Sequence, residues 1–175
     1  MPRLTSPDVR FHASFLAAVR EFTETDLDAA ALLGEDVGVY ARTWEEPEGF
    51  AALVDMLLAE TERPRRPDWV EMTNLWWAED DTFLGRLSIR HRLSPYLLEF
   101  GGHIGYAVRP GARRRGQATA MLGAALPLCR HLGIDRALVT CDTDNIASRK
   151  VIEANGGEFE DQRGGKLRYW IRTGN

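Results

Sequence analysis

The feature that most constrains the fold is a strand, an arginine-rich turn and a helix in immediate succession. Ile104–Val108 alternates in the manner of a strand, and Arg113, Arg114 and Arg115 follow within a few residues. Apolar residues then recur with helical spacing over residues 116–132. Such a turn aims several backbone N–H groups at one point, at the positive end of the helix dipole. The pattern therefore predicts a binding site for a pyrophosphate.

Two small residues, Gly116 and Ala118, strengthen this prediction. A phosphate approaches the main chain only where no bulky side chain stands in the way. The arginines supply charges that pair with phosphate groups. A run of arginines alone is more often a solvated surface, so the prediction depends on the glycine spacing, the preceding strand and the following helix together.

The spacing Arg113-x-x-Gly116-x-Ala118 after a strand resembles the acyl-coenzyme-A signature of the GNAT superfamily of N-acetyltransferases. It differs from the dinucleotide-binding fingerprint, which needs three glycines and a later acidic residue. A second segment, residues 136–157, resembles the GNAT strand and helix in which an Asn and a small hydroxyl residue meet the pantetheine arm. These residues are Asn145 and Ser148 here, so the signature region spans 103–157.

The resemblance implies an α+β fold with α/β/α layers. Its central sheet is mixed, mostly antiparallel and splayed at the fourth and fifth strands, with helices on both faces. The strand at 104–108 would part from the strand at 137–141 and leave a V-shaped gap, with a right-handed, locally parallel crossover between them. We expect residues 1–175 to form a single N-acetyltransferase domain, since 175 residues with 44% hydrophobic content suit one core.

The same resemblance implies acetyl-CoA as cosubstrate, with its pantetheine arm in the gap. The main-chain N–H of Val108 would polarise the thioester carbonyl. The implied activity is acetyl transfer to a primary amine of a small molecule or peptide, by direct attack in a ternary complex. The residues expected to bind the cosubstrate are Tyr106, Ala107, Val108, Arg113, Arg114, Arg115, Gly116, Gln117, Ala118, Thr119, Asn145 and Ser148.

Candidates for proton transfer are His103, Glu99 and Tyr106. An imidazole titrates near neutrality, which favours His103 as the base, although a strand-end histidine also commonly hydrogen-bonds the main chain. Glu99 and water are the other possible bases. Many GNAT enzymes carry a tyrosine as general acid where this chain has Ile152, so Tyr106 and Tyr169 are the possible substitutes.

Composition limits the partners. A net charge of −4 gives no basic footprint for nucleic acid, and it is compatible with a cationic acceptor such as a polyamine, an aminoglycoside or lysine. No apolar run is long enough to span a bilayer, and the N-terminus has no apolar leader, so we expect a cytoplasmic protein without membrane or nucleic-acid partners. The two cysteines and four histidines lack metal-ligand spacing, so we expect no metal. The last strands offer an edge for a homodimer.

Two alternative functions stay open. A non-catalytic acyl-CoA-binding or regulatory module would keep the arginine turn and lack a functional base. A toxin that acetylates aminoacyl-tRNA would need a further basic patch, for which Arg63, Arg65 and Arg66 are the available cluster.

Local signals predict the remaining elements. Ser6 as cap and Pro7 as first helical residue indicate a helix start, and apolar spacing predicts a helix from Pro47. Proline at 127 predicts a kink in the helix at 116–132. The further expected elements are a weak helix at 27–33, a loop at 36–46, a hairpin of 69–77 with 82–91, a helical turn at 94–99, a helix at 146–154 and strands at 158–162 and 167–172.

Overall fold

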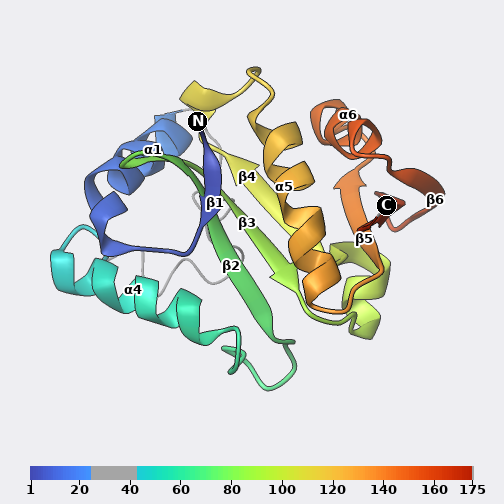
Figure 1. The fold of residues 1–175 in the computed structure, drawn as a ribbon, viewed down its shortest axis with the longest axis horizontal. Helices are drawn as coiled ribbons and strands as arrows, with labels where there is room; N and C mark the ends of the chain where they lie inside the picture. Colours follow the sequence, from blue (N-terminus) through green and yellow to red (C-terminus); the bar gives the residue numbers. More distant parts are fainter. Residues whose placement is uncertain (25–42, 175) are drawn as a thin grey trace.

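The computed structural model describes residues 1–24 and 43–174 (Figure 1). Three short helices, Val9–Phe11, Leu97–Gly101 and Pro110–Ala112, supplement the main elements. None of the helices in the described ranges is long and apolar enough to cross a membrane. The main elements are β1 (Arg3–Thr5), α1 (His12–Glu24), α4 (Pro47–Ala59), β2 (Met72–Glu79), β3 (Thr82–Arg90), β4 (Ile104–Val108), α5 (Gln117–His131), β5 (Arg136–Asp142), α6 (Ile146–Ala154), β6 (Glu158–Arg163) and β7 (Lys166–Arg172).

The strands form two antiparallel sheets. The first has the order β1-β2-β3-β4 and the second the order β5-β7-β6. In Figure 1, α1 and α4 lie on one side of the first sheet, and α5 lies on the other side with α6 beside it. This arrangement confirms the α+β fold with helices on both faces.

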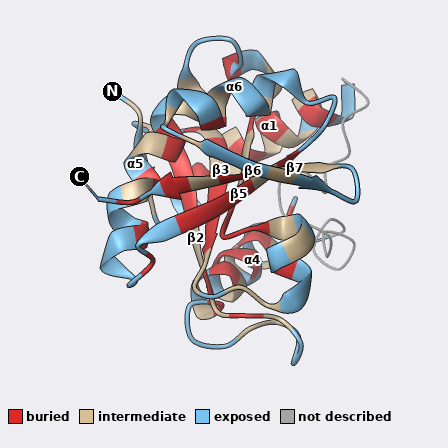
Figure 2. Cartoon of the chain, turned by 90° about the vertical axis from the view of Figure 1, so that its right-hand side faces the viewer, coloured by how far each residue is buried: buried red, intermediate tan, exposed pale blue. Residues whose placement is uncertain are grey.

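The alternation of β2 explains the two layers of core. Leu75 and Trp77 pack with α5 in one apolar cluster, whereas Trp76 and Ala78 pack with α1 and α4 in another. A strand that is apolar on both faces can hold helices on both sides. Figure 2 shows the buried residues concentrated on the strands and on the helix surfaces that face them.

Two hydrogen bonds join the two sheets where β4 begins. The His103 N–H donates to the Leu138 carbonyl oxygen at 2.7 Å, and the Leu138 N–H donates to His103 Nδ1 at 2.9 Å. Gly102 makes this approach possible, because its φ is 64° and a Cβ there would lie 2.5 Å from the Leu138 oxygen. Further along, β4 and β5 belong to separate sheets. The splay is confirmed. The expected parallel pairing of these two strands is wrong, because every described strand pair is antiparallel.

Several local expectations differ from the structure. Asp8 caps the first helical turn by accepting the Arg10 N–H at 2.9 Å, so the helix begins after Pro7. β1 was not predicted, because three residues are too few to show a period. β2 begins at Met72, three residues later than the expected 69. The helix expected at 27–33 and most of the loop at 36–46 lie outside the described residues.

Substitution of Phe15 tests the core beneath α1. Phe15 is fully buried, with ring centroids 5.2–5.8 Å from those of Trp44, Phe50, Trp76 and Phe83. We expect Phe15→Ala to lower the free energy of unfolding by about 3–5 kcal/mol in urea denaturation, because the ring leaves a cavity. Leu58→Ala on α4 is the control: Leu58 is 44% exposed, so a change within about 0.5 kcal/mol is expected. Equal effects of the two substitutions would contradict this packing.

Candidate functional site

The turn between β4 and α5 leaves the first turn of the helix open. Gly116 stands at the helix cap with φ 74°, and it has no side chain to bond the first N–H groups. A Cβ at Gly116 would meet no atom within 4 Å. The first turn of α5 therefore has open space at its positive end. The N–H groups of Gln117 to Thr119 belong to this turn. This geometry fits a phosphate group.

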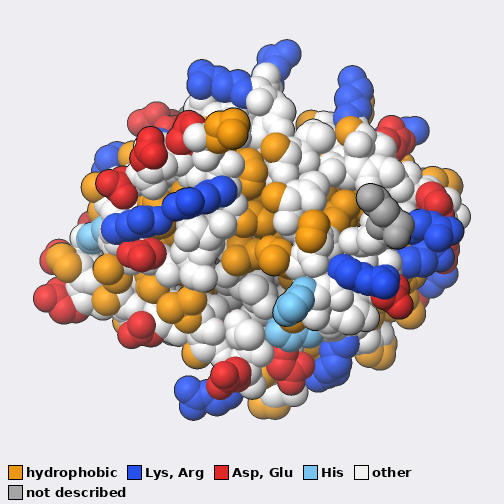
Figure 3. All heavy atoms as spheres, viewed as in Figure 1, with side chains coloured by type: hydrophobic (Ala, Val, Ile, Leu, Met, Phe, Trp, Pro, Cys, Tyr) orange, Lys and Arg blue, Asp and Glu red, His pale blue; other side chains and the backbone are white. Residues whose placement is uncertain are grey.

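The three arginines of the turn divide into two kinds. Arg113 donates through Nε to the Val108 carbonyl oxygen at 2.9 Å, and its guanidinium lies 5.4 Å from the centre of the Phe22 ring. Partial burial lowers the pKa of Arg113. Arg114 and Arg115 are exposed, and the described residues give neither of them an ion pair. Figure 3 shows basic side chains projecting at the top of the molecule, where this turn lies in Figure 1.

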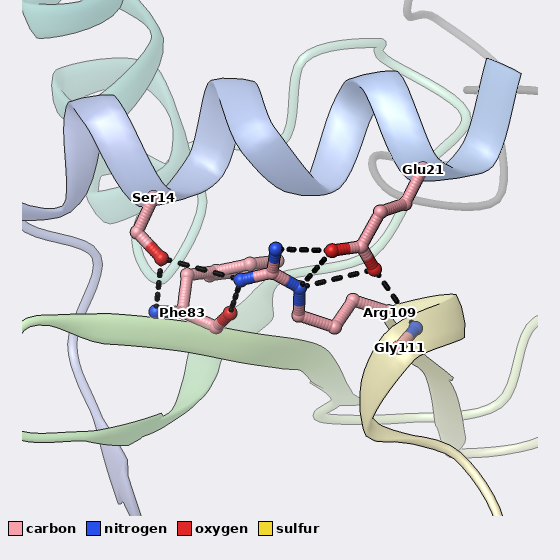
Figure 4. A network of polar contacts seen from close by, with 5 residues as sticks. All are labelled: Ser14, Glu21, Phe83, Arg109 and Gly111. Atoms are coloured by element: carbon pink, nitrogen blue, oxygen red, sulfur yellow. Dashed lines mark hydrogen bonds and ion pairs between the residues drawn. The ribbon is translucent and has the colours of Figure 1, made fainter. Parts of the chain in front are cut away.

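A carboxylate on α1 holds the turn in place (Figure 4). Arg109 Nε donates to the two Glu21 carboxylate oxygens at 3.1 and 3.2 Å, and the Gly111 N–H donates to Glu21 Oε2 at 2.8 Å. Arg109 Nη1 also donates to the Phe83 carbonyl at 3.0 Å and to Ser14 Oγ at 3.4 Å. The hydrogen bond from Arg109 lowers the pKa of Glu21. The turn is thus fixed to α1 and β3 together.

A cavity of about 620 Å³ lies where β4 and β5 diverge. Ile104, Gly105 and Tyr106 line it from β4, and Thr140, Cys141 and Asp142 line it from β5. Asn145 and Ser148 of the second predicted motif also line it. The structure therefore brings Tyr106, Asn145 and Ser148 together, as expected of residues that share one site.

Main-chain groups of β4 face this divergence. The Arg109 N–H donates to the Leu84 carbonyl and the Arg90 N–H donates to the His103 carbonyl, which fixes the ladder with β3. Bonds along an antiparallel ladder alternate, so the N–H groups of Tyr106 and Val108 point away from β3. The resemblance predicts that these two N–H groups bond a pantetheine arm or a thioester carbonyl.

Tyr106 is joined to α6 across the site. Its hydroxyl lies 2.7 Å from Ser148 Oγ, and Asn145 Oδ1 accepts the Ser148 N–H at 3.0 Å as the cap of α6. Burial raises the pKa of Tyr106 to about 12. Tyr106 therefore keeps its proton at neutral pH, so its hydroxyl can donate a hydrogen bond. Tyr169 is 2% exposed, and its hydroxyl donates to Glu153 at 3.3 Å, so it belongs to the core.

The other two candidates for proton transfer do not line the cavity. His103 is 7% exposed, and burial together with the charge of Arg90 lowers its pKa to about 4. Its Nδ1 accepts the Leu138 N–H, so the neutral ring carries its proton on Nε2 and has no lone pair left for a substrate. Glu99 forms an exposed ion pair with Arg163 at 2.6 Å. The geometry favours a positioning role for His103, and the assignment of either residue as base stays a prediction.

Sequence reasoning missed a second group of cavity residues. Arg86, Ser88 and Arg90 line the cavity from β3, and Asn74 lines it from β2. The signal was present in the alternation of β3, which places these three polar residues on one face of an interior strand. The contact of Glu21 with Arg109, made between residues far apart in the chain, left no local signal.

Replacement of His103 separates the two roles of its ring. Asparagine places an acceptor oxygen near the position of Nδ1, so we expect His103→Asn to retain the contact with Leu138 and to keep its turnover in a thiol-release assay. His103→Leu leaves the Leu138 N–H unsatisfied, which costs about 1–3 kcal/mol of the free energy of unfolding. If His103→Asn lost turnover while its free energy of unfolding stayed that of the wild type, His103 would be the base after all.

The pH dependence of stability gives a second readout. The pKa of His103 is lowered from 6.5 to about 4 in the folded state, so the unfolded chain takes up a proton first as the pH falls. We expect the free energy of unfolding of the wild type to decrease as the pH falls from 6.5 to about 4. In His103→Asn the decrease should be smaller. His131→Asn, at an exposed histidine, should follow the wild type in urea denaturation at each pH.

Solved structures share this fold. RimJ of Mycobacterium smegmatis in complex with CoA-disulfide is 21% identical, with a TM-score of 0.69 over 98% of this chain and 81% of that chain. The microcin C7 self-immunity acetyltransferase MccE, in complex with acetyl-CoA and AMP, is 12% identical, with a TM-score of 0.64 over 98% and 92%. The Salmonella typhimurium acetyltransferase that modifies the N-terminal serine of ribosomal protein L7/L12 is 16% identical, with a TM-score of 0.60 over 98% and 94%.

The sequence itself gives a family match. No curated protein matches the chain. The family model described as "Acetyltransferase (GNAT) domain" matches residues 18–158, a span that includes Glu21, the arginine turn and the cap of α6. Because this match covers most of the chain and agrees with the splayed sheets and the open helix start, the chain belongs to the GNAT acetyltransferase family.

Proposed function

We propose that the protein transfers an acetyl group from acetyl-CoA to a primary amine of a small molecule or peptide, by direct attack in a ternary complex. The observation that carries the proposal is the open, positive start of α5 beside the cavity between β4 and β5. Structures of two similar proteins, RimJ and MccE, hold CoA-disulfide and acetyl-CoA with AMP. Family membership and these ligands support the choice of cosubstrate.

Two sets of groups in this chain fit the ends of acetyl-CoA. Arg114, Arg115 and the N–H groups at the start of α5 would hold its phosphates, since the space before Gly116 is open. The N–H groups of Tyr106 and Val108 would bond the pantetheine end. When bound, acetyl-CoA supplies a thioester carbonyl that an amine attacks.

The residues around the cavity provide the polar groups for this reaction. The Val108 N–H would donate to the carbonyl oxygen as negative charge develops there, a contribution worth about 2.7–4 kcal/mol for comparable donors. The Tyr106 hydroxyl, which stays protonated, would donate to the departing sulfur. Water would take the proton that the ammonium group loses, and the neutral amine would then attack the thioester carbonyl.

The two alternatives receive unequal support. In the basic cluster that an RNA-binding toxin would need, two arginines pack against other side chains. The guanidinium groups of Arg65 and Arg66 lie 5.1 and 5.3 Å from the Trp69 ring centre, and Arg65 forms an ion pair with Glu60. This arrangement gives no support to a tRNA-acetylating toxin. A non-catalytic acyl-CoA-binding module stays the alternative function, because it needs the arginine turn and does not need a residue for proton transfer.

A pair of glycine variants tests the cosubstrate site. Gly116 and Gly133 flank opposite ends of α5, have φ of 74° and 79°, and both face open space. Tryptophan at either position carries similar backbone strain, so only a ligand at the start of α5 distinguishes them. In calorimetric titration with acetyl-CoA we expect Gly116→Trp to weaken binding by at least about 30-fold, roughly 2 kcal/mol, and Gly133→Trp to bind like the wild type. Equal binding by both variants would remove the proposed site.

A pair of tyrosine variants tests whether the protein is an enzyme. Tyr106→Phe removes the hydroxyl in the cavity, whereas Tyr169→Phe removes one in the core. We expect Tyr106→Phe to lower kcat by about 10- to 100-fold in a thiol-release assay against a panel of amines, with acetyl-CoA affinity nearly unchanged. Tyr169→Phe should retain kcat. Binding of acetyl-CoA without turnover on any amine would favour the non-catalytic module.

A further inference from the structure

The cavity is bordered by two segments that adjoin the same edge of the first sheet. β2 begins and β3 ends at the paired residues Met72 and Arg90, and β4 begins beside them at Ile104. The segment that leads into β2, residues 69–72, and the segment between β3 and β4, residues 94–101, therefore both reach this edge. Each of them contributes side chains to the cavity wall.

Most of the side chains that these two segments contribute are apolar. Trp69, Val70 and Met72 line the cavity from the first segment, and Tyr96, Leu97 and Phe100 line it from the second. Tyr106 and Ser148, whose hydroxyl oxygens lie 2.7 Å apart, line the same cavity. The cavity therefore combines an aromatic wall with the polar groups at which acetyl transfer is proposed.

Two rings of this aromatic wall are exposed next to each other. The ring centroids of Tyr96 and Phe100 lie 5.5 Å apart, and the two residues are 60% and 36% exposed. Leu97, which lies between them in the sequence, is buried and anchors the segment in the protein. Large apolar side chains that are exposed together mark binding sites, whereas single exposed ones are normal. The pair therefore presents ring surface to a ligand in the cavity.

Contacts with the second sheet hold the segment of Phe100 in place. The Phe100 ring lies against the turn between β6 and β7, where a Cβ on Gly164 would be 2.4 Å from Phe100 Cε1. Thr140 Oγ1 on β5 donates to the Phe100 carbonyl at 2.7 Å, and Arg168 Nε on β7 donates to the Leu98 carbonyl at 3.0 Å. Because this wall is already fixed, a ligand that binds it loses little free energy in ordering it.

Three cations of the cavity wall are bound to groups of the protein itself. Arg65 forms an ion pair with Glu60 at 2.5 Å, and Lys166 forms one with Asp142 at 2.6 Å. Arg90 Nη1 donates to two main-chain carbonyls at 3.2 and 3.4 Å, just before β4 begins. These cations stabilise the wall, whereas the exposed rings offer surface to an acceptor.

We propose that the acceptor is a primary amine that carries an aromatic group, and that Tyr96 and Phe100 bind this group. The inference rests on the proposed acetyl transfer and names the class of its acceptor. The two rings and Tyr106 line one cavity of about 620 Å³, which is the size of a small-ligand site. Aromatic rings in contact are stabilised beyond the effect of the area they bury. The cationic acceptors suggested by the net charge, such as polyamines, carry no such ring.

Matched amines test the proposal through turnover with acetyl-CoA. Phenylpropylamine is compared with propylamine, phenylalaninamide is compared with alaninamide, and spermidine serves as a polycation without a ring. We expect the aromatic member of at least one pair to have a kcat/KM at least about tenfold higher than its aliphatic partner, because its ring leaves water for the wall. The first pair represents an arylalkylamine and the second the N-terminal residue of a peptide, so the two sources are distinguished.

Variants of the exposed rings locate the selectivity. We expect Tyr96→Ala and Phe100→Ala each to lower the aromatic-to-aliphatic ratio of kcat/KM by about 3- to 10-fold, and Tyr96→Phe to keep the wild-type ratio because it retains the ring. The control is Phe159→Ala, because Phe159 on β6 is 58% exposed and lies outside the cavity wall. Its ratio should equal that of the wild type. Differences in amine basicity and in the fraction of folded protein cancel when ratios are compared between variants.

Three results would overturn the aromatic acceptor. They are a ratio near one in both pairs, a kcat/KM for spermidine that matches that of the aromatic amines, and a ratio that both alanine variants leave unchanged. Each of these results is obtained with protein that acetylates an amine, so each leaves the proposed acetyl transfer standing. Absence of acetyl-CoA binding in calorimetric titration of the same preparation would instead overturn the proposed function.

Discussion

The two hydrogen bonds between His103 and Leu138 determine the architecture of the site. They join the sheets at one point, and beyond that point β4 and β5 diverge around the cavity. The arrangement requires Gly102, whose backbone leaves room for the Leu138 carbonyl, and a histidine ring that stays neutral at physiological pH. The described residues of β4 and β5 form no ladder with each other, and the cavity opens between the two strands.

A second constraint orients the arginine-rich turn. Glu21 on α1 accepts hydrogen bonds from Arg109 and from the Gly111 N–H, so the turn depends on a residue that lies 88 positions before Arg109 in the sequence. Arg109 also bonds the Phe83 carbonyl, which ties the same turn to β3. The start of α5 is further held by Trp77 Nε1, which donates to Gln117 at 2.7 Å. Several elements therefore position this turn.

Much of this arrangement could be predicted from local sequence. The strand at 104–108, the helix after Gly116 and the cap at Asn145 each have a period or spacing that short segments reveal. β1 is too short to show one, and the bond of Glu21 to Arg109 joins residues that no local pattern relates. The place of Arg86 and Arg90 in the cavity wall depends on which face of β3 the cavity adjoins. Tertiary contacts alone decide which face this is. The alternation of β3 could therefore be seen in the sequence, but the position of the cavity on its polar face could not.

The hydrogen bonds of Glu21 also limit how the site can be studied in isolation. The carboxylate lies on α1, and it accepts hydrogen bonds from Arg109 and from the Gly111 N–H of the turn. A fragment that starts after α1 would keep the arginine turn in its sequence and lose the carboxylate that orients it. The site therefore has to be studied in a chain that retains this helix.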